Sequence, residues 1–109
     1  CHVEAFETGP SAFAPLDRKQ VRAYSDFLLH DMGPNLADDI VAGSADGREF
    51  RTAPLWGASQ TGPYLHDGRA ATLDEAIRMH EGEAVRARDR FLALEKADRE
   101  ALLAFLKSL

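Results

Sequence analysis

The stretch Thr72-Leu73-Asp74-Glu75-Ala76-Ile77-Arg78-Met79-His80 predicts a helix over residues 73–80. Thr72 offers a hydroxyl at the N-cap and Glu75 a carboxylate three residues later, which is the pattern of a capping box. His80 continues the apolar face of this helix at the i+7 position, whereas Met79 shares a face with Thr72 and Glu75. The apolar face consists of Leu73, Ala76 and Ile77. The pattern therefore predicts that His80 points into the protein and that Met79 does not.

Two further helices are predicted in the last third of the chain. Residues 83–92 are rich in Ala and Arg, which are good helix formers, and they carry Ala84, Ala87 and Phe91 at helical spacing. Residues 96–108 form one apolar stripe at i, i+3, i+4 and i+7, made of Leu102, Phe105, Leu106 and Leu109. Together the helices predict an all-α domain.

The first two thirds of the chain contain no long regular element. Glycine and proline turn signals interrupt residues 33–69 repeatedly, yet the segment is too rich in apolar side chains for a disordered linker. These apolar residues are Leu36, Ile40, Val41, Phe50, Leu55, Trp56, Tyr64 and Leu65. A long irregular loop packed around a large apolar ligand reconciles the two observations. For residues 24–33 the sequence does not decide between a helical turn and the end of a strand.

Composition excludes several classes of protein. The 109 residues correspond to one small domain, and a net charge of -5 without a basic stripe argues against a nucleic-acid partner. No run of eighteen apolar residues is present, so we expect no membrane span. Cys1 is the single cysteine, which excludes an internal disulfide and a zinc site of two thiolates. The start at Cys1-His2 is neither a signal peptide nor an initiating methionine, and we expect a processed or cut chain.

Several strings resemble one protein family. The string Arg51-Thr52-Ala53-Pro54-Leu55-Trp56-Gly57 and residues 61–76, which include Pro63-Tyr64-Leu65-His66-Asp67-Gly68-Arg69, are similar to the region after the second haem of bacterial di-haem cytochrome c peroxidases. Residues 24–34 and Met79-His80-Glu81-Gly82-Glu83-Ala84 narrow the resemblance to a branch called di-haem, or thiol, oxidoreductases. With the closing helix, the resemblance runs nearly end to end.

The resemblance implies a cytochrome c-like fold and a covalently bound haem c. In the family a Cys-x-x-Cys-His motif binds haem through two thioethers, and its histidine is an iron ligand. Cys1-His2 matches the last two positions of that motif, so the helix before it and the first cysteine are missing. Residues 1–109 then form a single C-terminal fragment, either with its haem or without it. The second axial ligand falls fourteen residues after His66, on His80, which implies metal ligation by His2 and His80.

The remaining candidate residues have two interpretations each. His66 and Tyr64, from the Pro-Tyr-x-His string, are expected beside the haem, but His66 would equally stabilise a turn next to Asp67-Gly68. Arg51 and Arg69 suit haem propionates, because a guanidinium pairs bidentately with a carboxylate, although surface salt bridges explain them as well. An inward-facing His80 also has a structural alternative, satisfied by a backbone carbonyl.

The function implied by the resemblance is electron transfer within a periplasmic di-haem oxidoreductase, with the intact protein a peroxidase. Its partners would be an N-terminal haem domain of the same protein and a small redox protein. Because His80 would fill the remaining coordination position of the iron, we expect no catalytic residue in this domain. Two alternatives stay open: a haem-free metal- or ligand-binding module that uses His30, His66 and His80, and an apo scaffold fragment.

Overall fold

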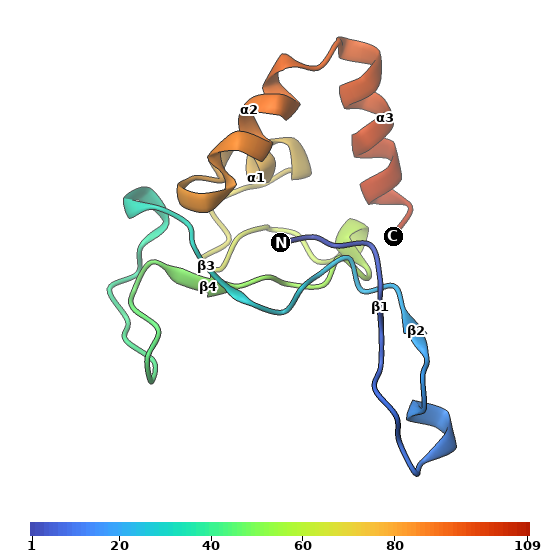
Figure 1. Ribbon diagram of the computed structural model, residues 1–109. Coiled ribbons are helices and arrows are strands. Elements are labelled where there is room, and N and C mark those ends of the chain that lie inside the picture. The colour runs from blue at the N-terminus through green and yellow to red at the C-terminus, as the bar shows by residue number, and fades with distance from the viewer.

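A computed structural model describes all residues, 1–109, and it contains helices and short β-hairpins. The helices α1 (Leu73–Met79), α2 (Val85–Ala93) and α3 (Lys96–Lys107) lie together on one side of the molecule (Figure 1). Four single-turn 3-10 helices occur at Ala14–Leu16, Pro34–Leu36, Ala58–Gln60 and Gly82–Ala84. No helix has the length and apolar character needed to cross a membrane.

The prediction of an all-α, cytochrome c-like domain is wrong: the fold is mixed, because the first half of the chain forms two antiparallel pairs of strands. Strand β1 (Phe6–Glu7) pairs with β2 (Gln20–Val21), and β3 (Leu29–Asp31) pairs with β4 (Glu49–Arg51). The β1–β2 hairpin extends away from the helices (Figure 1). Pairing gives the backbone groups of the irregular segment hydrogen-bond partners, and strands of two or three residues are too short to show an alternating pattern.

The sequence located the helices well. Helix α1 begins after Thr72 with both hydrogen bonds of the capping box and ends at Met79, so that His80 is its C-cap. The second predicted helix is divided into the turn Gly82–Ala84 and α2, and α3 ends one residue earlier than expected. Of the predicted α3 stripe, Leu106 is buried and Leu109 packs against the small core of Ala58, Leu73 and Leu106, but Leu102 and Phe105 are exposed.

The protein atoms do not close a large core. Only 13 of the 109 residues are buried, and Ser25 is the largest fully buried side chain. The accessible surface is 7311 Å², whereas a globular monomer of this mass exposes about 6,000 Å². The radius of gyration is 15.5 Å, against about 13 Å for a compact domain of this length. The folded chain therefore leaves apolar side chains exposed, which a ligand or another part of a protein could cover.

The turn after His80 depends on one glycine. Gly82 has φ +56°, and a Cβ built on it would lie 2.1 Å from the carbonyl oxygen of Asp31. We expect Gly82→Ala to lower the free energy of unfolding by about 3 kcal/mol or more, because it adds a backbone clash to the strain of a positive φ. Gly43→Ala is the matched control, since Gly43 has φ +65° in open space and should lose only about 1 kcal/mol. Urea unfolding of both variants checks this, and equal losses would contradict the close packing.

Candidate functional site

The backbone of residues 24–26 holds the Cys1-His2 dipeptide in place. The backbone N–H of Asp26 donates to the carbonyl of Cys1 at 2.8 Å, and the backbone nitrogen of Cys1 lies 3.1 Å from the Asp26 carboxylate. Between them, Ser25 is fully buried and donates from its hydroxyl to the carbonyl of Thr52 at 2.8 Å. The segment that binds the dipeptide is thus itself hydrogen-bonded to the interior of the protein, next to β4.

His2 keeps one ring nitrogen free. Its Nδ1 donates to the carbonyl of Tyr24 at 2.8 Å, so that in the neutral ring Nε2 carries the lone pair. His2 as a whole residue is exposed. Neighbouring protein atoms nevertheless desolvate its imidazole, and this desolvation lowers the pKa of His2. A charge on the nearby His80 lowers that pKa further. A neutral imidazole with a free Nε2 is the form that binds a metal.

His80 has the same arrangement at the end of α1. The Nδ1 of His80 donates to the carbonyl of Ala76, one turn earlier, at 2.6 Å. The Arg88 guanidinium donates to the backbone carbonyl of His80 at 3.3 Å. The residue is half-buried, whereas the neighbouring Met79 is 37% exposed. The backbone-bonded histidine that the sequence left open is therefore present, and it still leaves Nε2 unused.

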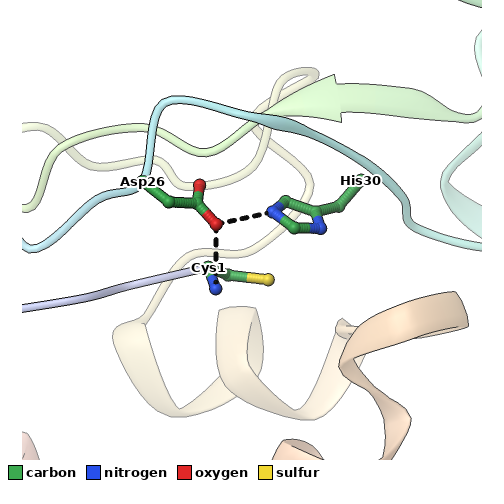
Figure 2. A group of neighbouring side chains, drawn as sticks. All are labelled: Cys1, Asp26 and His30. Carbon is green, nitrogen blue, oxygen red and sulfur yellow. Dashed lines mark hydrogen bonds and ion pairs between the residues drawn. The ribbon is translucent and has the colours of Figure 1, made fainter.

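Asp26 contacts a second group of residues, Cys1 and His30. Figure 2 shows its carboxylate between the backbone nitrogen of Cys1 and the ring of His30, whose Nε2 donates to Asp26 at 2.8 Å. The Cys1 sulfur, the Asp26 carboxylate and a His30 nitrogen lie within 4.8 Å of one another, a grouping that could hold a metal ion. However, Nδ1 of His30 donates to Glu83 at 2.9 Å. Both nitrogens of His30 thus carry protons for carboxylates, and a metal would have to displace one of them.

The other predicted site residues make contacts with residues other than His2 and His80. His66 is exposed and stacks on Phe50, with ring centroids 4.2 Å apart, and Tyr64 donates from its hydroxyl to the carbonyl of Ala58 at 2.9 Å. Arg69 pairs with Asp67, and the Arg51 guanidinium lies 5.7 Å over the ring of Phe27. His80 lies near enough to His2 for a charge on it to lower the pKa of His2, and the structure holds His30 and His66 in separate contacts of their own.

Sequence reasoning did not single out two residues that contact the candidate site residues, Asp26 and Glu83. Asp26 binds the backbone of Cys1, and Glu83 binds His30 across 53 residues of chain. The only sequence signal was the spacing of Asp26 and His30, which is also common in unrelated segments. Contacts between distant parts of the chain leave no local pattern.

The ion pairs of His30 predict a dependence of stability on pH. Hydrogen bonds to Glu83 and Asp26 raise the pKa of His30 above 6.5, and the bond from His30 lowers that of Glu83 below 4.5. Partial burial opposes ionisation of Asp26, but hydrogen bonds from Leu28 and His30 outweigh it and lower its pKa below 3.8. The His30 contribution is present below pH 6.5 and lost as pH rises through its folded pKa, while the carboxylates lose theirs as pH falls through their own folded pKa values.

We therefore expect the combined contribution of these three groups to stability to be largest between about pH 5 and pH 6.5. Urea unfolding across the pH range measures this, with His30→Gln as the variant that removes the titrating group. The fall in stability above the maximum should disappear in His30→Gln. A fall of unchanged size in that variant would assign it to another group.

Comparison with known proteins gives one match. The family model described as "Di-haem oxidoreductase, putative peroxidase" matches residues 1–109, the whole chain. No curated protein and no solved structure matches the chain significantly.

Proposed function

The chain belongs to the di-haem oxidoreductase family, and from this premise we propose that it is a haem c electron-transfer domain. In this proposal Cys1 forms a thioether to the haem, and His2 and His80 are the two axial ligands of its iron. The domain is the C-terminal part of a longer periplasmic protein whose N-terminal domain carries the second haem. Its electrons come from, or go to, a small redox protein.

One observation carries the proposal: two imidazoles are prepared in the same way. His2 and His80 each donate Nδ1–H to a backbone carbonyl, at 2.8 and 2.6 Å, and each keeps Nε2 free. Metal-bound histidines almost always donate their second ring nitrogen to a carbonyl or carboxylate in this way, which fixes the tautomer and the ring orientation. The two histidines also lie near enough for a charge on His80, when present, to lower the pKa of His2.

The surroundings fit a large apolar group as well. Segments that carry the candidate ligands and their supports leave large side chains exposed, namely Val3, Phe27 and Leu28. The accessible surface also exceeds that of a compact monomer of this mass, which likewise indicates apolar surface that a ligand could cover. The Cys1 thiol is exposed and makes no disulfide, so it is available for a thioether. A haem that covered these side chains would supply the missing core.

The donor set defines the chemistry. When bound between these residues, the haem would supply one-electron transfer. His2 and His80 would both hold the iron, and in this proposal the domain has no catalytic residue. Two imidazoles also favour a lower reduction potential than a histidine and methionine pair, because Met/His ligation raises the potential.

Counting haems tests the proposal. We expect the full-length protein, purified from the periplasm, to give a pyridine haemochrome of two covalent haems and low-spin bands on reduction. Cys1→Ala should weaken covalent attachment in the peptide that contains His2, as mass spectrometry of the digested protein would show. A purified protein with bound metal but without haem absorption would support a haem-free metal module instead.

A further inference from the structure

The turn that follows His80 is hydrogen-bonded to β3 and to the turn after it, which are about fifty residues away in the sequence. Glu83 accepts hydrogen bonds from the ring of His30 at 2.9 Å and from the backbone N–H of Asp31 at 3.1 Å. Glu81 accepts two bonds from the side-chain amide of Asn35, each 2.9 Å long. Gly82 lies directly against the carbonyl of Asp31. The three residues after His80 are therefore docked on β3 and the turn behind it.

His30 continues this connection to the segment that carries His2. Its Nε2 donates to Asp26, and Asp26 also lies against the backbone nitrogen of Cys1, as Figure 2 shows. The His30 side chain is only 15% exposed and Asp26 only 17%, so that the bond between them is partly shielded from competing water, whereas Glu83 at the other end is 55% exposed. An unbroken chain of contacts thus runs from His80 through Glu83, His30 and Asp26 to Cys1-His2.

The chemistry of this link needs an imidazole with a proton on each nitrogen. Such a ring donates in two nearly opposite directions across a rigid, fixed span, and both acceptors are carboxylates. A glutamine of similar length has one amide group that donates and one oxygen that does not. It therefore cannot serve Asp26 and Glu83 together.

On the basis of the proposed function, we propose that His30 is a positioning residue that sets the separation of the two axial imidazoles. It does so by joining the segment that holds Cys1-His2 to the turn that follows His80. His30 touches neither haem nor substrate in this proposal and is no ligand. Its effect is on how firmly His80 stays on the iron.

The rate at which His80 leaves the iron measures this effect. In the reduced, haem-loaded full-length protein, carbon monoxide binds to a six-coordinate iron only after His80 dissociates, so the slow phase of binding in stopped-flow reports that step. His80→Ala identifies the phase by abolishing it. We expect His30→Gln and Glu83→Gln each to accelerate the slow phase about tenfold, because each removes a charge-assisted hydrogen bond.

The double variant separates positioning from general destabilisation. If His30 and Glu83 act through their mutual bond, His30→Gln combined with Glu83→Gln should be no faster than the more affected single variant. Multiplied effects, or slow phases unchanged in both singles, would overturn the proposal. Glu83 is 55% exposed, so Glu83→Gln should fold even if His30→Gln does not. Glu100→Gln on α3, which removes the same charge from an exposed pair with Lys96, should leave the rate unchanged.

The outcomes also distinguish this proposal from the function on which it rests. A wild-type protein without covalent haem, or without a phase sensitive to His80→Ala, would contradict the haem-domain proposal itself. A normal slow phase that neither Gln variant alters would contradict only the role of His30.

Discussion

The His80→Ala variant of the haem-loaded protein is expected to change one haem from a low-spin to a high-spin spectrum. His80 is the second of the two imidazoles with a free Nε2, and its removal would leave iron bound by His2 alone. The vacant position would then accept water, carbon monoxide or peroxide. Absorption spectra of the oxidised and reduced forms measure the change, and half of the total haem should show it if the protein binds two.

Met79 provides the matched control for this variant. It is adjacent to His80, but its side chain is exposed and is not part of the small core. Met79→Ala should therefore keep the low-spin spectrum. If Met79→Ala gave the high-spin form and His80→Ala did not, the sulfur would be the ligand and the assignment to His80 would be wrong.

The protein without haem is expected to be expanded and weakly ordered. Only 13 residues are buried, and the radius of gyration of 15.5 Å already exceeds that of a compact domain. Each 100 Å² of apolar surface that the haem covers contributes about 2.5 kcal/mol. Loss of the haem should therefore lower the melting temperature of this domain by on the order of ten degrees or more.

Expression without haem attachment provides the comparison. The haem-free protein should bind 8-anilinonaphthalene-1-sulfonate strongly and lose near-ultraviolet circular dichroism, while it retains the far-ultraviolet signal of α1 to α3. The haem-loaded protein should do neither. Equal melting temperatures and equal dye binding in the two forms would show that the exposed apolar side chains are not covered by haem.

The sequence predicted those elements whose stability is local. The capping box of α1 joins residues three apart, and α3 has a regular apolar stripe, so both helices appeared at nearly their observed bounds. The hairpins were missed because their strands are two or three residues long and are held by pairing across many residues. Glycine and proline signals marked this part of the chain as irregular, but they do not reveal which backbone groups pair.

The same distinction applies to the candidate site. The apolar face of α1 pointed His80 inward, and the half-buried position of His80 beside an exposed Met79 agrees with that geometry. The bond of His2 to the Tyr24 carbonyl and the bridge from His30 to Glu83 span 22 and 53 residues, and only the folded chain reveals them. Helical periodicity could orient one ligand, but it could not show what supports it.

A structure of the haem-loaded protein at atomic resolution would test the central claim most directly, through the distances from iron to Nε2 of His2 and of His80. We expect both nitrogens at bonding distance on opposite faces of one haem, with Nδ1 of each ring still bonded to the carbonyls of Tyr24 and Ala76. An iron that carries His2 but has water, a sulfur or another side chain in place of His80 would contradict it.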